Sequence, residues 1–328
     1  MTIINNPLLS VTNLSVSFTG KPASAPFRAV DNVSFNVFPG EVLGLVGESG
    51  CGKTTLSRAV MGLTPVDGGS VVLQGTDLTK LTTGQLRRHR TKMQMVFQDP
   101  YASLNPRMTV FDALVEPLRY HRKTPRVDCP REAALLLEKV GLDIKSMRKF
   151  PHEFSGGQRQ RIAIARALAV GPEMIIADEP VSALDVSVQA QILNLLSDLR
   201  NDMGLTMLFI SHDLSVVRYI ANRIAVMFKG KIVEIGMRDE VFGSPLHPYT
   251  QALLAAIPIA DPDHSYAAPL QPTFSDQHTH KEFNNGCAYA ARCHYALSEC
   301  KSIVPLLEPL SENEEHQAAC IRKHELKL

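Results

Sequence analysis

Hydrophobic and polar positions divide the chain into alternating strand-like and helix-like segments. Up to about Gly75, short apolar runs are separated by turns, as in "LLSVTNLSVSF", "AVDNVSFNV", "EVLGLVG" and "GSVVLQG", and these runs predict strands. From "LTTGQLRRHR" to about Lys149, apolar residues recur mostly at helical spacing, as in "CPREAALLLEKVGL". The pattern therefore predicts a strand-rich first part followed by a helical region.

The middle of the chain returns to an alternation of helices and strands. The run "GGQRQRIAIARALAV" predicts a helix before the strand "MIIAD", and "SVQAQILNLLSDLRNDMG" predicts another before the strand "TMLFIS". This alternation favours a mostly parallel sheet covered on both faces. From Ser244, a predicted helix leads into a polar linker that extends to about Asn285, and a cysteine-bearing tail follows.

Composition and charge narrow the class of protein. The chain has 328 residues, of which 45% are hydrophobic and 20% charged, as in a globular protein with one large and one smaller domain. The formal net charge of +1 gives no overall attraction to nucleic acid or to an anionic membrane. The sequence lacks an apolar run of the roughly 20 residues that span a membrane, and it lacks a secretory signal. We therefore expect an intracellular protein whose cysteines stay reduced or bind metal.

The stretch "GESGCGKTT", directly after the apolar run "VLGLV", has the pattern of a phosphate-binding loop. Its defining positions are Gly47, Gly52, Lys53 and Thr54, and a helix-like run follows. The glycines allow backbone N–H groups to converge on phosphate oxygens, while Lys53 supplies positive charge at the β- and γ-phosphates. Thr54 offers its hydroxyl to Mg²⁺. The sequence therefore predicts a nucleoside triphosphate site.

The predicted strand "MIIAD" ends in an acidic residue, and a second acidic residue follows it directly. Asp178 is suited to hold the hydration shell of Mg²⁺, and Glu179 is suited to orient and deprotonate an attacking water molecule. Any apolar strand can end in an acid, so this interpretation depends on the phosphate loop upstream in the same α/β unit.

The segment "FSGGQRQR" predicts a second anion-binding site. Ser155 is placed to cap the helix that follows, and backbone amides, its hydroxyl and the helix dipole would all favour an anion. A chain with one phosphate loop has no internal use for a second such site. We therefore expect this surface to close over the nucleotide of another subunit.

In this combination the motifs resemble those of the ATP-binding subunits of ABC transporters, over about Leu8 to Gly243. Gly47–Thr55 resembles their Walker A loop and Met174–Glu179 their Walker B strand. "FSGGQ" resembles their signature motif, with Phe154 where leucine is commoner. The order of the motifs along the chain carries the resemblance.

The resemblance also implies roles for residues outside these three motifs. His212, in "ISHD", resembles the switch histidine that contacts the γ-phosphate. Gln98, in "MVFQDP", resembles the Q-loop glutamine that links Mg²⁺ and water to the surface facing the membrane subunits. The segment "SALD", Ser182 to Asp185, resembles the D-loop across the dimer seam. Phe18 resembles the aromatic residue that stacks on adenine, with Phe27 as a rival.

The resemblance thus implies three sets of site residues. The catalytic set is Glu179, His212 and Gln98. The Mg²⁺ set is Thr54, Gln98 and Asp178. Contacts to ATP are expected from Phe18, Gly47, Glu48, Ser49, Gly50, Cys51, Gly52, Lys53, Thr54, Thr55, Ser155, Gly156, Gly157, Gln158 and Asp185.

The fold that the resemblance implies is α/β. It is an ABC-type P-loop NTPase with a RecA-like core, a mixed sheet and a helical subdomain. The ATPase domain is expected over residues 1–243, with the helical subdomain at about 99–162. A small cysteine-containing extension is expected over residues 244–328.

The activity that the resemblance implies is transport-coupled hydrolysis of ATP to ADP and phosphate. ATP binding would close a head-to-tail dimer with a second ATPase subunit, identical or different, and hydrolysis would reopen it. Transmembrane permease subunits are the expected direct partners, and a periplasmic or extracellular solute-binding protein is an indirect one. We expect a peripheral protein at the cytoplasmic face of the inner membrane, with no nucleic-acid partner.

Two further segments suggest the solute. "QDPYASLNPRMTV" and "SPLHPYTQALLAAIP" resemble parts of the ATPases of oligopeptide, dipeptide and nickel transporters, which favours import of di- or oligopeptides. Nickel or another small solute is the alternative. A soluble ABC ATPase acting in DNA repair or on the ribosome is a poorer match, because the chain lacks a long coiled-coil insertion and a second ATPase unit.

Four cysteines stand in the tail, namely Cys287, Cys293, Cys300 and Cys320. Their spacing is wider than in common zinc sites, so reduced thiols, zinc and an iron–sulfur cluster all remain open on spacing alone. The tail resembles that of peptide-transporter ATPases, some of which carry a 4Fe–4S cluster. The resemblance implies a structural cluster, with zinc as the alternative. His294 and His316 are substitute ligands that we expect at the surface instead.

Overall fold

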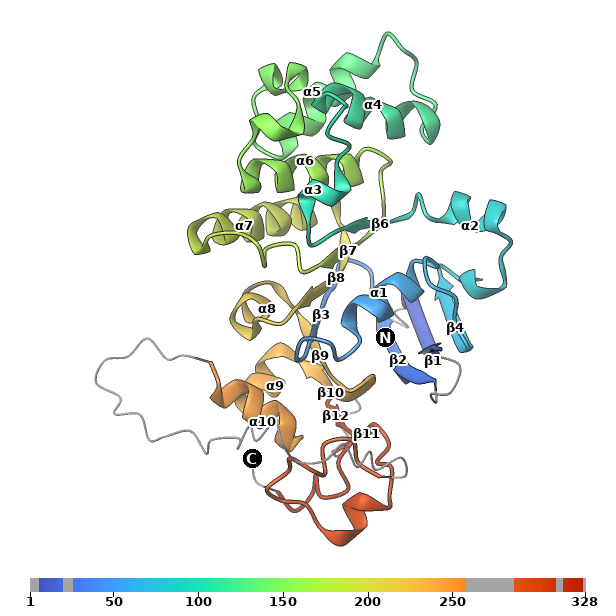
Figure 1. Cartoon of the computed structure of the whole chain (residues 1–328), viewed down its shortest axis with the longest axis vertical. Coiled ribbons are helices and arrows are strands. Elements are labelled where there is room, and N and C mark those ends of the chain that lie inside the picture. The colour runs from blue at the N-terminus through green and yellow to red at the C-terminus, as the bar shows by residue number, and fades with distance from the viewer. Residues whose placement is uncertain (1–5, 20–25, 258–285, 311–314, 327–328) are drawn as a thin grey trace, which may run out of the picture.

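Two β-sheets organise the described part of the chain, as the computed structural model shows (Figure 1). The structure describes residues 6–19, 26–257, 286–310 and 315–326. The linker predicted before Asn285 therefore lies outside the described residues from position 258 onward. The smaller sheet has the strand order β2-β1-β4-β5, and the larger sheet has the order β11-β12-β10-β9-β3-β8-β7-β6.

The smaller sheet is antiparallel, and its burial follows the alternation in its sequence. In β1 (Leu9–Phe18), the side chains of Leu9, Val11, Leu14 and Val16 are buried. The remaining strands are β2 (Phe27–Val37), β4 (Gly68–Leu73) and β5 (Thr76–Asp77). The strands predicted at the start of the chain are thus confirmed.

The larger sheet has a parallel centre that is buried on both faces. Strands β3 (Val42–Val46), β7 (Met174–Asp178) and β8 (Thr206–Ser211) contain only buried residues, which explains their almost continuous apolar runs. Strands β3, β8, β7 and β6 pair in parallel in that order, as predicted. The other strands are β6 (Met93–Val96), β9 (Arg223–Phe228), β10 (Lys231–Met237), β11 (Glu308–Pro309) and β12 (Gln317–Ala318).

The α-helices flank these sheets. They are α1 (Lys53–Val60), α2 (Thr83–His89), α3 (Pro100–Ser103), α4 (Val110–Tyr120), α5 (Cys129–Lys139), α6 (Gly156–Leu168), α7 (Val186–Met203), α8 (Leu214–Ile220), α9 (Arg238–Gly243) and α10 (Pro248–Ala255). No helix among the described residues combines the length and the apolar composition that crossing a lipid bilayer requires.

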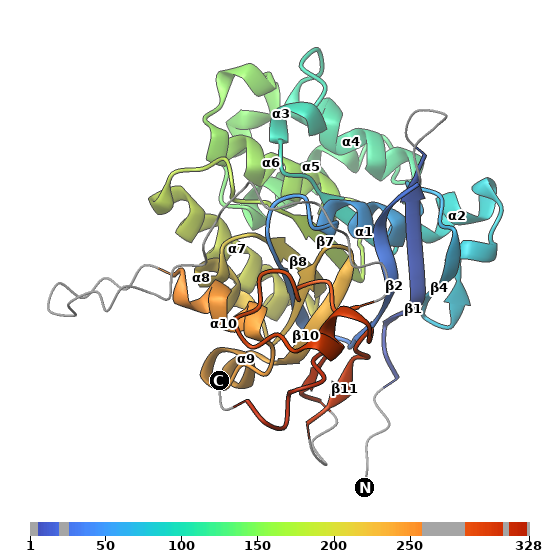
Figure 2. The ribbon, with the colours of Figure 1, turned by 60° about the horizontal axis from the view of Figure 1, so that its bottom comes forward.

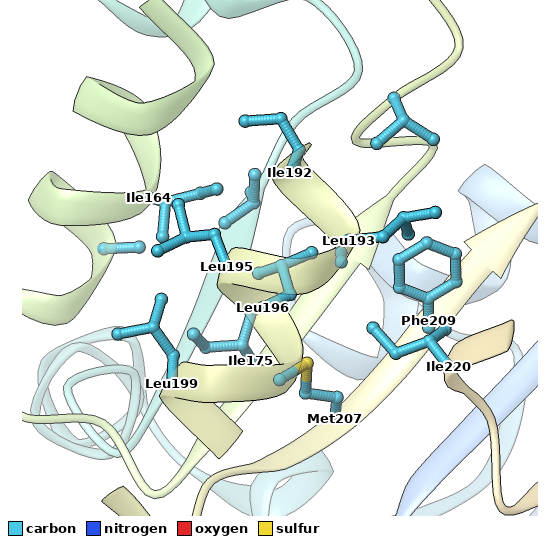
Figure 3. Packing of buried hydrophobic residues seen from close by; sticks show 14 of the residues in the cluster. Ile164, Ile175, Ile192, Leu193, Leu195, Leu196, Leu199, Met207, Phe209 and Ile220 are labelled. Carbon is cyan, nitrogen blue, oxygen red and sulfur yellow. The ribbon is translucent and has the colours of Figure 1, made fainter. Parts of the chain in front are cut away.

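The larger sheet separates two hydrophobic cores because successive side chains of each strand point to opposite faces. Ile175 of β7 belongs to the core shared with α6, α7 and α8, whereas Ile176 belongs to the core shared with α1 and the smaller sheet. Figure 3 shows Leu196 of α7 among Ile175 and other side chains of the first core. The sheet therefore has a packed layer on each face, as the sequence predicted.

Helices α3 to α6 gather at one end of the molecule (Figures 1 and 2). Leu114 and Leu118 of α4, Leu137 of α5 and Ile162 of α6 are buried in a common core. The helical region predicted up to Lys149 is confirmed, apart from strand β6. That strand is only four residues long, so its alternation of buried and exposed side chains is too short to be recognised between two helices.

The cysteine-bearing tail adds strands to the larger sheet. Strand β12 pairs antiparallel with β10, placing Ala318 opposite Glu234, and β11 pairs with β12. The two tail strands are two residues long each, too short for a pattern of hydrophobic positions to reveal them. The tail thus continues the core sheet at its β10 edge.

Glu234 anchors this end of the chain from inside the protein. Its side chain is fully buried and accepts hydrogen bonds from the backbone N–H of Leu246 (2.8 Å) and of His247 (2.9 Å). Nε2 of His316 lies 2.9 Å from the same carboxylate. The expectation that His316 lies at the surface is therefore wrong, because its ring is buried against Glu234; His294 is exposed, as expected.

His247 should make stability depend on pH. The ring is buried at the N-cap of α10, and its Nδ1 accepts a hydrogen bond from the Tyr249 N–H. Burial lowers the pKa of His247 from 6.5 to about 3. Below pH 6.5 the unfolded chain therefore binds a proton that the folded chain does not, and stability falls as the pH falls.

Because of His247, we expect the free energy of unfolding to be about 2 kcal/mol lower at pH 5 than at pH 7. His247→Asn keeps an acceptor for the Tyr249 N–H but does not titrate, so its stability should decline less over the same range by that amount. Urea unfolding at the two pH values measures both chains. Identical declines in the two chains would contradict the assignment.

Candidate active site

The phosphate loop joins the carboxyl end of β3 to the start of α1, and two of its positions admit only glycine. A Cβ on Gly47 would lie 2.1 Å from the carbonyl oxygen of Met227, and a Cβ on Gly52 would lie 2.2 Å from that of Ala29. Gly50, at the exposed tip, has a φ of +78° but no neighbouring atom within 4 Å of an added Cβ. The glycines therefore let strands β9 and β2 press against the loop backbone.

Lys53 turns its ammonium group back across the loop. The residue is buried, and Nζ donates to the carbonyl oxygens of Gly47 (2.7 Å) and Glu48 (2.9 Å). Cys51 is also buried, which raises the pKa of its thiol and fits the predicted space-filling role. The other predicted loop contacts are more open: Ser49, Gly50 and Thr54 are exposed, and Glu48, Gly52 and Thr55 are half-buried.

The predicted Mg²⁺ residues Thr54 and Asp178 lie next to each other. The Thr54 hydroxyl donates to Oδ1 of Asp178 at 3.3 Å, and the Ser57 hydroxyl donates to Oδ2 at 3.3 Å. Burial raises the pKa of the Asp178 carboxyl, because the charged form is costly away from water. A hydroxyl and a carboxylate are hard oxygen ligands, so this donor set fits Mg²⁺. Ser57 was not among the predicted site residues. It lies about one helical turn after Thr54, on the same face of α1, and this position brings its hydroxyl to Asp178.

The three predicted catalytic residues meet at one carboxylate oxygen. Nε2 of Gln98 donates to Oε2 of Glu179 at 3.1 Å, and Nδ1 of His212 lies 3.2 Å from the same oxygen. Gln98, predicted also as an Mg²⁺ contact, thus touches Glu179 in the described structure. Glu179 has a φ of +50°, which is rare outside glycine, and its N–H donates to the carbonyl oxygen of Ile210 (2.9 Å).

The topology of the larger sheet explains this convergence. The phosphate loop follows β3, His212 follows β8, Glu179 follows β7, and Gln98 comes two residues after β6. These strands are parallel neighbours in that order, so their carboxyl ends meet at one edge. Ligands of open α/β sheets bind at this edge.

The signature segment starts helix α6. Ser155 is the N-cap, its hydroxyl accepts from the Gln158 N–H (3.3 Å), and the Gln158 side chain accepts from the Ser155 N–H (3.1 Å). Ser155 and Gln158 are exposed, Gly156 is half-buried, and Gly157 is buried against Val188. Figure 1 shows α6 with the helical group and apart from α1. The segment predicted as a second anion-binding site is therefore open to solvent at Ser155 and Gln158.

The remaining predicted contacts are exposed as well. Asp185 is the N-cap residue of α7 and makes no side-chain capping bond. Phe18 and Phe27 are 47% and 62% exposed and stand directly opposite each other across β1 and β2. Because the two residues are paired at the same end of β1 and β2, the fold does not distinguish which ring would stack on a base.

Two residues that the sequence analysis missed contact the phosphate loop from the C-terminal extension. The Glu48 N–H donates to the hydroxyl oxygen of Tyr249 at 3.0 Å. The guanidinium group of Arg292 donates to both carboxylate oxygens of Glu48, at 2.9 and 2.7 Å. Tyr249 and Arg292 are 201 and 244 positions from Glu48 along the chain, and no local pattern marks such pairs.

The four tail cysteines line one small cavity. Its volume is about 20 Å³, and its walls include Cys287, Cys293, Cys300 and Cys320. Burial raises the pKa of the Cys287 and Cys320 thiols and raises that of Cys293 to about 11. Cys287, Cys293 and Cys320 are therefore protonated at neutral pH, and binding a metal to them would release protons.

Residues 6–19, 26–257, 286–310 and 315–326 contain no group of three or more histidine, cysteine or carboxylate side chains placed to hold a metal ion. The four cysteines thus share a cavity but not the compact geometry of a single-ion site.

Two family models match the sequence. The one described as ABC transporter matches residues 30–182. The one described as oligopeptide/dipeptide transporter, C-terminal region, matches residues 233–300. The first match includes the phosphate loop and Glu179, and the second includes Tyr249 and Arg292.

Several curated relatives carry the name oligopeptide transport ATP-binding protein OppF. The protein from Salmonella typhimurium is 45% identical over 323 residues, which cover 96% of this chain and 96% of the relative. The protein from Streptococcus mutans is 53% identical over 263 residues, which cover 80% of this chain and 85% of the relative.

Solved structures of ATP-binding cassettes have the same fold. A dimeric cassette in a post-hydrolysis state with ADP and phosphate is 29% identical, with a TM-score of 0.64, and the match covers 70% of this chain and 98% of that one. CbiO1 of Clostridium perfringens, part of an ABC transporter complex, is 26% identical with a TM-score of 0.65, covering 73% and 91%. These likenesses confirm the predicted fold class.

The two kinds of loop glycine should respond differently to alanine. Gly50→Ala adds a methyl group in open space, so only the left-handed backbone opposes it, at about 1 kcal/mol. Gly52→Ala meets the same backbone penalty and also the Ala29 carbonyl, so we expect about 3 kcal/mol or more of destabilisation. Denaturant unfolding of both variants measures the difference. An equal loss in both would show that the loop is looser than its contacts indicate.

Proposed function

The chain belongs to the ABC transporter family of ATP-binding subunits, and on this premise we propose that it drives the import of di- or oligopeptides. As a member of that family it hydrolyses ATP with Mg²⁺. The observation that carries the active-site assignment is the meeting of Gln98 and His212 on Glu179, beside the phosphate loop. The names of the relatives and of the matched C-terminal region support peptides as the solute.

Hydrolysis needs the γ-phosphate and a water molecule to be positioned and their charge neutralised. We assign charge neutralisation to Lys53, with Thr54 and Asp178 holding Mg²⁺, which supplies Lewis-acid stabilisation of phosphate charge when bound. Glu179 is the group that takes a proton from water, because its carboxylate lies at the same sheet edge as the loop. Gln98 and His212 hold that carboxylate by two contacts to one oxygen, and His212 also supplies a contact to the γ-phosphate.

We propose that two ATPase subunits, identical or different, complete each site together. The capped start of α6 is exposed and suited to an anion, and α6 lies apart from α1, the helix that follows the chain's own phosphate loop (Figure 1). A partner's signature segment, with its Ser155, Gly156, Gly157 and Gln158, would close over the ATP, and Asp185 would lie at the seam. ATP binds the closed pair better than the open pair and so drives closure, and hydrolysis reverses it. The dimeric relative bound to ADP and phosphate supports this arrangement.

The proposed docking site for the permease is a hollow between the helical group and the sheet. Its volume is about 510 Å³, and its lining includes Phe97, which is next to Gln98, as well as Leu63 and Tyr120. These three side chains are 38%, 47% and 64% exposed. An apolar segment of a transmembrane permease there would contact the residue next to the catalytic glutamine, at the cytoplasmic face of the membrane. A solute-binding protein would act through the permease, and nucleic acid is not part of the proposal.

Two other functions remain as alternatives. The same motor would serve an importer of nickel or another small solute, since nothing in the ATP site reads the solute. A non-transport ABC ATPase is the second alternative. Uptake of labelled di- and oligopeptides, and of nickel, by cells with and without this subunit separates the three, because only an importer loses uptake of its own solute.

We further propose that Cys287, Cys293, Cys300 and Cys320 hold a structural 4Fe–4S cluster, with zinc as the alternative. Four thiols around one cavity are a suitable donor set for either. A zinc ion requires all four sulfurs at about 2.3 Å from one point, and the described residues contain no such compact group. A cluster accepts more widely spaced sulfurs, because each thiolate binds a different iron. The cavity of about 20 Å³ would have to widen around it.

Replacing Glu179 with Gln should stop hydrolysis while ATP binding continues, because glutamine cannot take a proton from water. We expect kcat to fall by at least about 100-fold, measured as phosphate release by the assembled transporter. Glu138→Gln removes an exposed carboxylate from α5 and serves as the matched control. Turnover in Glu179→Gln equal to that of the control would show that the base is misassigned.

Anaerobically purified chain should contain about four irons and four sulfides and show the visible absorption of a cluster. Cys293→Ser should lose them, whereas Cys129→Ser, a buried cysteine outside the tail, should keep them. Zinc without iron would support the alternative. A folded, colourless and metal-free protein would contradict both forms of the proposal.

A further inference from the structure

Glu48 of the phosphate loop is held from two sides by the C-terminal extension. Its backbone N–H donates to the Tyr249 hydroxyl (3.0 Å), and its carboxylate forms a bidentate ion pair with Arg292 (2.9 and 2.7 Å). Both contacts are made within the loop that receives the phosphates. The extension therefore contacts the proposed ATP site directly.

Tyr249 is a rigid support for the loop. It is 1% exposed, and the centre of its ring lies 4.5 Å from the ring centre of Phe228 and 5.4 Å from the ring centre of Tyr289. Its backbone N–H is fixed by the His247 ring. Because the Glu48 N–H is directed at this hydroxyl, it is not directed at phosphate oxygens.

Arg292 is held in position by the same aromatic cluster. Its guanidinium carbon lies 5.6 Å from the ring centres of both Phe228 and Tyr289. Its backbone N–H donates to the carbonyl oxygen of Tyr289 (2.9 Å), in the turn that runs between Cys287 and Cys293. The planar fork of arginine matches both carboxylate oxygens at once, which fixes direction as well as charge.

The charge of Glu48 explains why such a contact would matter. A triphosphate carries several negative charges, and an unpaired carboxylate in the loop would oppose its binding. Arg292 neutralises that carboxylate and draws it toward the extension. The loss of Arg292 would leave Glu48 free to turn toward the phosphates.

We propose that Arg292 and Tyr249 are positioning residues for ATP binding, which set the conformation and the charge of the phosphate loop through Glu48. This inference rests on the proposed function, since it takes ATP as the ligand of the loop. It makes the cysteine-bearing tail part of the nucleotide site. A change in the turn between Cys287 and Cys293 would then alter ATP affinity.

The test compares Arg292→Gln, Glu48→Gln and the double variant in the full-length chain. Mg²⁺ and the fluorescent analogue mant-ATP report affinity, and phosphate release by the assembled transporter reports KM and kcat. Because the pair is partly exposed, Arg292→Gln should weaken affinity and raise KM about two- to fivefold with kcat retained. The double variant should bind more tightly than Arg292→Gln alone, because the carboxylate that opposes ATP is gone. Arg292→Lys should recover part of the affinity.

Arg322→Gln is the matched control in the same tail. The guanidinium group of Arg322 donates to the Tyr295 carbonyl and to Glu325, both in the tail and not in the phosphate loop. It should leave affinity unchanged, while Tyr249→Phe, which removes the acceptor for the Glu48 N–H, should weaken it. Unfolding curves show whether each variant is folded.

Two results would overturn the inference. Unchanged affinity in folded Arg292→Gln would show that the ion pair has no effect on the loop. Additive losses in the double variant, or an equal loss in Arg322→Gln, would show that the tail acts only as general structural support. If the unmodified chain itself fails to bind mant-ATP, the proposed function fails and not this inference alone.

Discussion

The tight seating of the phosphate loop is the constraint on which the rest of this structure depends. Carbonyl oxygens of β9 and β2 lie so close to Gly47 and Gly52 that a single Cβ would collide with either. Inside the loop, Lys53 bonds two of its carbonyl groups, and the Gly230 N–H donates to the Cys51 carbonyl (2.8 Å). A loop fixed in this way presents its backbone to a phosphate without having to be ordered at the moment of binding.

The carboxylate of Glu179, which we propose as the catalytic base, depends on the same sheet. Four parallel strands end at one edge, and each delivers one functional segment there: the phosphate loop, His212, Glu179 and Gln98. Glu179 adopts a left-handed backbone at this edge, which only the surrounding bonds can maintain. The chemistry of the site therefore follows from the order of strands in the sheet, which is buried on both faces and hence resistant to rearrangement.

Two groups of contacts join the extension to this core. Glu234, fully buried, joins β10 to the start of α10 and to His316, while strand β12 continues the sheet beside it. Buried Tyr249 and partly exposed Arg292 also contact Glu48 in the loop. An aromatic cluster of Phe228, Tyr249 and Tyr289 connects these two regions. These contacts join the tail both to the core sheet and to the phosphate loop.

The sequence by itself determined the parts whose cause is local. Continuous apolar runs specified the parallel strands, helical spacing specified α6 and α7, and short glycine-rich patterns marked the phosphate loop and the capped start of α6. It also suggested Gln98, Glu179 and His212, but through order and resemblance, since each residue alone has ordinary structural uses. Only the tertiary structure showed that these three meet at one oxygen, that His316 is buried, and that Arg292 pairs with Glu48. Those contacts join residues that are from 33 positions apart, as in Glu179–His212, to 244 positions apart, as in Glu48–Arg292. They form because the strand order and the added tail strands bring distant segments together. A pattern read over a short stretch of sequence does not contain that information.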